Sequence, residues 1–193
     1  MVRVIIGAAA AAVAMLIVGF LLFATPLNGL GTGNVGNAEA AQLQSALALN
    51  LPRTGTYAVP DPNTAEQTVM YGQGPVATIH YNTGSYAAND PAMIVWGAVL
   101  NFITALLIGL GLLGIDARVP DFASRARLII PLAVAAAGFI RLSDPIRLHQ
   151  DWGNALYGFF GNALALVVGG LIVAWFIPHR PSAAAPADAP TEV

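Results

Sequence analysis

Three long stretches of uncharged, mostly apolar residues constrain the fold of this chain more than any other feature. They cover residues 4–24, 92–115 and 155–177, and none of them contains Asp, Glu, Lys or Arg. A helix needs about 20 apolar residues to cross a bilayer core that is roughly 30 Å thick. Each stretch is long enough, so the sequence predicts three membrane-spanning helices.

A fourth apolar stretch, residues 128–140, has only 13 residues. At about 1.5 Å per residue it is roughly 20 Å long, which is too short to cross a bilayer. Asp121 is a good N-cap, however, and a helix over residues 122–140 can span if Arg125 and Arg127 extend back to the membrane interface. We therefore expect a fourth spanning helix, and a re-entrant or interfacial segment is the alternative.

The distribution of arginine predicts the orientation of the chain, because the side richer in basic residues faces the cytoplasm. The first apolar stretch is longer than the core of a signal peptide, about 7–15 residues, which indicates an uncleaved anchor. We expect both termini in the cytoplasm and the chain in a bacterial inner membrane. The arginines on the expected inner side are Arg3, Arg118, Arg125, Arg127 and Arg180, and those on the outer side are Arg53, Arg141 and Arg147.

The segment between the first two spans, residues 25–90, has an ordinary polar composition and is too long for a simple loop. It opens with NGLGTGNVGN (28–37), which is typical of a flexible linker. The G-x-G-x-x-G spacing in this linker lacks the preceding strand of a dinucleotide site. The elements expected after it are a helix over 38–49, a strand over 56–59, a helix that starts at a capping box over 63–66 and ends at Gly72 or Gly74, and a strand over 75–82.

Together these elements predict an α-helical integral membrane protein with four transmembrane helices and a small α+β extracytoplasmic cap between the first two. Asp90-Pro91 and Asp144-Pro145 are each expected to start a helix, because proline suits the first helical turn and Asp can cap it. The expected regions are an N-terminal transmembrane anchor (1–24), the cap (25–90), a three-helix transmembrane region (91–177) and a disordered cytoplasmic tail (178–193).

Two stripes of small residues at helical spacing are expected to let the spanning helices approach closely. Packing of four helices inside one chain is the favoured interpretation, and contact between two copies of the chain is the alternative. The first stripe contains Gly97, Asn101, Ala105 and Gly109, and the second contains Gly161, Ala165 and Gly169.

The segment RLSDPIRLHQDW, residues 141–152, concentrates charge in a chain of which only 9% of the residues are charged. We expect it either to join the cap to the helices or to form a binding site, with the joint favoured. A short helix leading to Trp152 is expected to place Arg147, Gln150 and Asp151 on one face. Arg141, if buried, needs a partner such as Asp144 or Asp151. The alternative, which is somewhat favoured, is that Arg141 extends its charge to the membrane interface from the end of the helix. The candidate binding residues are His80, Arg141, Asp144, Arg147, His149 and Asp151.

Composition and motifs exclude several classes of function. The absence of Cys excludes disulfides, thiolate metal sites and a Cys nucleophile, and a net charge of −2 gives no basis for binding nucleic acid. The sequence contains no familiar catalytic motif, so it predicts no catalytic residue. The spacing of its three His residues suggests no third ligand, so we expect neither a metal site nor a cofactor.

Three segments, LPRTGTYAVP, AEQTVMYGQGPVATIHYN and DPIRLHQDWGNALYGF, carry a resemblance to a known group of proteins. The chain resembles uncharacterised bacterial inner-membrane proteins that share an N-terminal anchor, a small outer domain and three further spans. The resemblance covers most of the chain and implies the same architecture. It implies no activity and no functional residue.

Two classes of function remain. The leading hypothesis is a non-enzymatic accessory, assembly or envelope protein, embedded in the lipid bilayer, whose outer cap contacts a membrane or periplasmic protein or a second copy of the chain. The alternative is a protein that binds a small molecule, lipid or ion, as a transporter or membrane enzyme does, through the polar segment 141–152.

Overall fold

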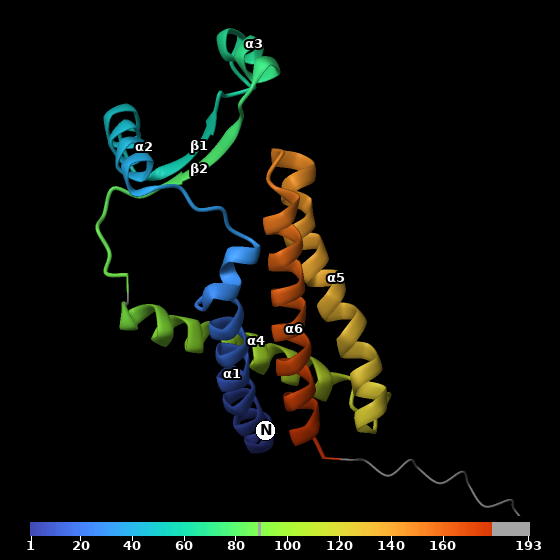
Figure 1. The fold of residues 1–193 in the computed structure, drawn as a ribbon. Coiled ribbons are helices and arrows are strands. Elements are labelled where there is room, and N and C mark those ends of the chain that lie inside the picture. The colour runs from blue at the N-terminus through green and yellow to red at the C-terminus, as the bar shows by residue number, and fades with distance from the viewer. Residues whose placement is uncertain (89, 179–193) are drawn as a thin grey trace, which may run out of the picture. The chain divides into compact units, whose positions relative to one another are not determined.

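The computed structural model of this protein describes residues 1–88 and 90–178, so the expected tail beyond Pro178 lies outside the described residues. The structure is mostly helical (71%) and contains a small two-stranded sheet (Figure 1). Its four helices long and apolar enough to cross a membrane are α1 (Val2–Phe23), α4 (Pro91–Gly114), α5 (Phe122–Leu148) and α6 (Trp152–Phe176). The expectation of four such helices beside a small α+β segment is confirmed.

The starts of α4 and α5 follow from their capping aspartates. Asp90 accepts a hydrogen bond from the Ala92 amide at 2.9 Å, and Asp121 accepts one from the Ser124 amide at 2.8 Å. Both expected starts are confirmed. The expected start at Asp144-Pro145 is wrong, because α5 runs on to Leu148 and contains both residues. Pro145 removes only the single bond to the carbonyl one turn earlier, and this close to its end the helix tolerates that loss.

The chain leaves the helical conformation directly after Leu148, so the expected short helix with Arg147 and Asp151 on one face is also wrong. His149 has a φ of 52°, in the left-handed region, and this reverses the chain within a few residues. Asp151 then caps α6, because its carboxylate accepts a hydrogen bond from the Asn154 amide at 2.7 Å.

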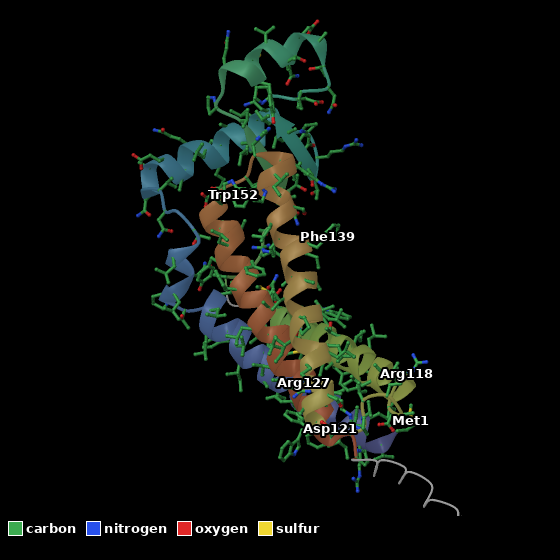
Figure 2. The ribbon with its side chains drawn as sticks, turned by 90° about the vertical axis from the view of Figure 1, so that its right-hand side faces the viewer. Met1, Arg118, Asp121, Arg127, Phe139 and Trp152 are labelled. Carbon is green, nitrogen blue, oxygen red and sulfur yellow. The ribbon has the colours of Figure 1, made fainter. Side chains whose placement is uncertain are left out.

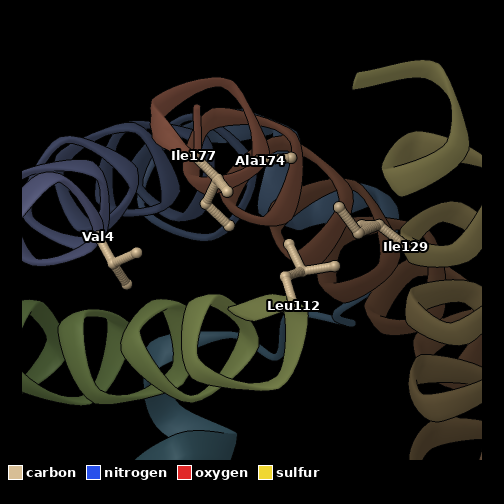
Figure 3. Close-up of a cluster of buried hydrophobic side chains, with 5 residues drawn as sticks. All are labelled: Val4, Leu112, Ile129, Ala174 and Ile177. Carbon is tan, nitrogen blue, oxygen red and sulfur yellow. The ribbon is translucent and has the colours of Figure 1, made fainter. Parts of the chain in front are cut away.

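The chain divides into two compact units. The first unit contains Met1–Val18, Ile94–Val134 and the described part of the chain from Leu164, and it holds the buried apolar core. Glycine lets its helices approach, since a Cβ at Gly109 would lie 2.6 Å from Val4 and 2.8 Å from Val173. One core cluster contains Val4, Leu112, Ile129, Ala174 and Ile177 (Figure 3), and the other contains Ala8, Ala11, Met15, Ala105 and Val173.

The second unit contains Gly19–Met93 and Ala135–Ala163. The end of α1 continues into a 3-10 helix, η1 (Pro26–Leu30), and α6 holds both. The Tyr157 hydroxyl donates to the Leu22 carbonyl at 2.5 Å, and the side-chain amide of Asn154 donates to the Gly31 carbonyl at 2.8 Å. The first part of the expected flexible linker therefore has a defined conformation.

The cap, defined here as residues 37–81, contains α2 (Asn37–Asn50), β1 (Gly55–Val59), α3 (Ala65–Gln73) and β2 (Ala77–Tyr81). The strands pair antiparallel, with Gly55 opposite Tyr81. All four expected elements are confirmed in type and order. The expected capping box is wrong, because Thr64 is the N-cap and its side chain makes no capping bond. The Asp61 carboxylate instead accepts from the Asn63 amide at 2.9 Å, and α3 ends at Gly74, where φ is 65°.

Candidate functional site

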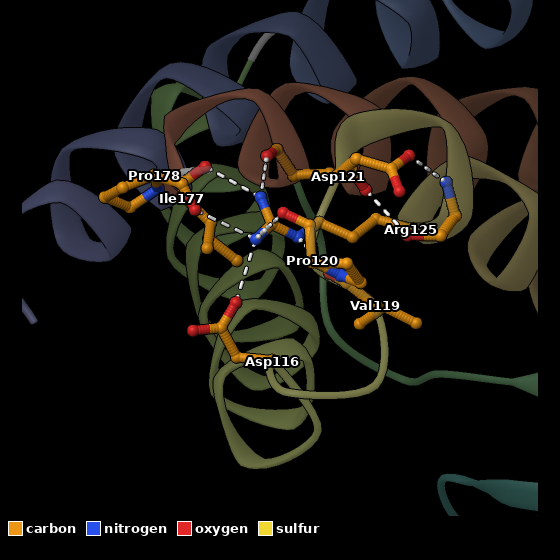
Figure 4. A network of polar contacts seen from close by, with 9 residues as sticks. Asp116, Val119, Pro120, Asp121, Arg125, Ile177 and Pro178 are labelled. Atoms are coloured by element: carbon orange, nitrogen blue, oxygen red, sulfur yellow. Dashed lines mark hydrogen bonds and ion pairs between the residues drawn. The ribbon is translucent and has the colours of Figure 1, made fainter. Parts of the chain in front are cut away.

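Arg125, in the first turn of α5, is fully buried and has acceptors for all three of its side-chain nitrogens. Its Nη2 pairs with the Asp116 carboxylate at 2.9 Å, and its Nη1 donates to the Ile177 carbonyl at 2.7 Å (Figure 4). The remaining acceptors are the carbonyls of Val119 (3.0 Å), Pro120 (3.2 Å), Ala174 (3.4 Å) and Pro178 (3.0 Å). The guanidinium thus joins the end of α6 to the connection between α4 and α5.

The end of α6 explains why an arginine belongs at this position. The last carbonyls of a helix have no partner within the helix, and α6 has no basic residue in its last turn. Arg125 supplies the missing donors from α5, and Asp116, only 7% exposed, supplies the opposite charge. The side chain of Arg125 is therefore enclosed by the protein, which itself provides a complete set of acceptors.

The polar residues of the first unit gather near this network. Met1, Arg118, Asp121 and Arg127 lie toward the same end of the helices of this unit (Figure 2). Arg118 and Arg127 are exposed, in contrast to Arg125. This end therefore presents positive charge around a neutralised buried pair.

Arg141 lies in the second unit, where α5 contacts α6 at Gly158. A Cβ at Gly158 would overlap the Arg141 guanidinium, so only glycine leaves space for it. The Arg141 Nε is buried and has no hydrogen-bond partner. Among the residues that the structure describes, no ion pair joins Arg141 to Asp144 or Asp151. Arg141 is therefore packed against α6 while its charge has no partner among the described residues.

The other candidate residues of the polar segment are more open. Arg147, His149 and Asp151 are exposed, and Asp144 is half-buried. The cap reaches this segment through α3, where the ring of Tyr71 lies 6.2 Å from that of His149. His80 is exposed on β2, and its Nδ1 lies 3.1 Å from the Thr56 hydroxyl on β1. Within residues 1–88 and 90–178, no group of three or more His, Cys, Asp or Glu side chains is arranged to hold a metal ion.

The small-residue stripes lie against other helices of the same chain. A Cβ at Gly161 would lie 2.5 Å from Phe23, and one at Gly169 would overlap Met15. Gly97 faces Leu16 at 3.7 Å. The three remaining stripe positions are Ala105, which is fully buried, and Asn101 and Ala165, which are half-buried.

Comparison with known proteins adds no further guide to function. No family model, no curated protein and no solved structure matches this chain.

Proposed function

We propose that this protein is a non-enzymatic accessory or assembly factor of a bacterial inner membrane, whose extracytoplasmic cap binds a protein partner. The proposal rests on the exposure of α2, because none of the 14 residues of this helix is buried. The four apolar helices suggest a membrane protein, and the cap is the part of the described chain that lacks a buried core of its own.

The exposure of α2 is unusual because of its length and composition. Leu43 and Leu49 are 55% and 86% exposed. Isolated helices shorter than about 12–15 residues are marginal in water, and helices in proteins owe most of their stability to packing. In α3, Val69 and Met70 are likewise exposed, and a single two-stranded sheet adds little stability. A partner that covers these side chains would supply the missing packing.

A protein partner fits α2 better than a lipid surface does. Helices that lie on membranes are strongly amphipathic and carry Lys or Arg on the polar face. The segment NAEAAQLQSALALN contains no basic residue and places its Ala and Leu side chains around the whole circumference. A flat bilayer covers one side of a helix, whereas a groove in a protein covers several.

The distribution of positive charge supports an orientation in which the cap lies outside the cytoplasm. Arg118, Arg127 and the N-terminus lie toward one end of the first unit, and positive charge favours the cytoplasmic side (Figure 2). Because the chain has no native Cys, single cysteines report topology cleanly. We expect an impermeant thiol reagent to label Asn63→Cys, in the cap, but not Ala117→Cys, between α4 and α5. Labelling of the second variant in intact cells would contradict this orientation.

Site-specific photo-crosslinking in living cells tests the proposed docking. A photoreactive phenylalanine analogue at Leu43 or Leu49 should give one discrete product, while the same analogue at the exposed Asn63 should give none. A product that contains two copies of this chain would identify the partner as a second copy. Absence of a product from both leucine positions, or equal products from all three positions, would refute docking through α2.

A further inference from the structure

We infer that Arg141 forms a binding site for a phosphate oxyanion where α5 contacts α6. The inference does not depend on docking by the cap, because it rests on contacts between these two helices alone. It begins from the position of the Arg141 guanidinium against Gly158, whose missing side chain leaves space for it.

The Arg141 guanidinium has donors that no described residue accepts. A guanidinium has five N–H donors, and an arginine placed among apolar helices requires acceptors or a counter-charge. Nε is buried without a partner, and neither Nη1 nor Nη2 makes a hydrogen bond to a described residue. The guanidinium therefore keeps unused donors, and the absence of a side chain at Gly158 leaves it space against α6.

The nearby carboxylates do not neutralise this charge. Asp151 is occupied at the start of α6, where its carboxylate accepts from the Asn154 amide at 2.7 Å. Asp144 lies on the same helix as Arg141 but makes no ion pair with it in the part of the chain that the structure describes. The positive charge is left for a ligand.

The chemistry of the site favours phosphate. Arginine presents a planar fork of donors that matches phosphate oxygens, and it is the preferred residue for such contacts. At about 1.5 Å per residue α5 is about 40 Å long, close to the thickness of a bilayer with its headgroups, and Arg141 lies about 10 Å before its end. With α5 centred in a bilayer whose hydrocarbon core is about 30 Å thick, Arg141 lies about 5 Å inside the edge of that core. The oxyanion therefore belongs either to a phospholipid whose headgroup is drawn inward or to free phosphate that enters from solution.

Native mass spectrometry of the purified full-length chain, titrated with phosphatidylglycerol in a neutral detergent, distinguishes these sources. We expect R141Q to lose at least tenfold in the occupancy of the first bound lipid, while R147Q, at an exposed arginine of the same helix, stays within twofold of wild type. The same proteins are then titrated with inorganic phosphate alone, with thermal unfolding as the readout. A lipid effect specific to Arg141 identifies the headgroup as ligand, and a phosphate effect specific to Arg141 without a lipid effect identifies free phosphate.

A second pair of variants keeps the test decisive if R141Q does not fold. G158A retains the charge but places a methyl group where the guanidinium lies, so we expect at least a fivefold loss of binding. G138A is the matched control, because its Cβ would make only ordinary contact with Phe159 at 3.6 Å. If neither R141Q nor G158A changes the response to either probe relative to R147Q and G138A, the phosphate site is refuted.

Discussion

Arg125 and Arg141 lie on the same helix, near its two ends, but their surroundings differ sharply. Arg125 is fully buried among protein acceptors that include one carboxylate, whereas Arg141 has a buried Nε without a partner. A similar contrast separates the first unit from the cap. The first unit has a close-packed core, while the helices of the cap in the second unit contain no buried residue. We infer that residues whose hydrogen bonds and packing are complete within the chain have a structural role. Residues whose hydrogen bonds or packing are incomplete mark a surface that contacts a ligand or partner.

The largest expected effect comes from breaking the network around Arg125. R125M removes the buried ion pair with Asp116 and the donors to the end of α6, so we expect a loss of about 3–5 kcal/mol in the free energy of unfolding. Reversible unfolding in mixed detergent micelles measures it. R127M, at an exposed arginine one half-turn away, should change stability by no more than about 0.5 kcal/mol. Equal effects of the two substitutions would show that the hydrogen bonds and ion pair of Arg125 do not stabilise the fold.

A smaller effect is expected from overfilling the packed core of the first unit. G109L inserts a side chain where even a Cβ would lie 2.6 Å from Val4, so we expect a loss of about 1–3 kcal/mol. G111L is the control on the same helix, because nothing lies within 4 Å of a Cβ at that position. Thermal unfolding of the two variants in the same detergent compares them. Similar melting temperatures would show that α4 does not pack through Gly109.

The smallest change in stability is expected from a substitution at His149, in the turn between α5 and α6. His149 adopts a φ of 52°, which glycine tolerates better than a residue with a Cβ, so H149G should stabilise the protein by about 0.5–1 kcal/mol. Loss of the ring contact with Tyr71 offsets part of this gain. Q150G, at a neighbouring position without positive φ, should instead destabilise. A destabilised H149G with an unchanged Q150G would mean that the histidine ring matters more than its backbone conformation.

The elements of the fold were largely predictable because their signals are local. Apolar run length indicated three of the four long helices, and the N-cap at Asp121 indicated the fourth. Asp90 indicated the start of α4, and turn residues indicated the strands and helices of the cap. The Asp144-Pro145 pair carried the same local signal as Asp90-Pro91 and was misleading. One proline near the end of a helix costs a single hydrogen bond, and Pro145 lies only three residues before the last residue of α5.

The role of Arg125 was not predictable in the same way. Three of its acceptors are carbonyls 49, 52 and 53 residues away, and a main-chain carbonyl leaves no trace in residue identity. Two weaker signals were present, namely Asp116 directly after an apolar stretch and the absence of a basic residue in the last turn of α6. The unpaired state of Arg141 was equally hidden, because Asp144 and Asp151 are close in sequence but form no ion pair with it among the described residues.

If Arg125 serves the fold and Arg141 binds a lipid headgroup, phosphatidylglycerol should stabilise the protein only when Arg141 is present. The measurement is the free energy of unfolding of wild type, R125M and R141L in neutral detergent, with and without a saturating amount of this lipid. Without lipid, R141L should stay within about 0.5 kcal/mol of wild type, because the lost charge has no protein partner. A hundredfold excess over Kd should stabilise wild type by about 2.7 kcal/mol, and R125M by a similar amount from its lower starting point, but should leave R141L unchanged. Equal stabilisation of R141L and wild type would show that Arg141 does not bind this lipid. A response that is lost in R125M and kept in R141L would show that Arg125 binds it instead.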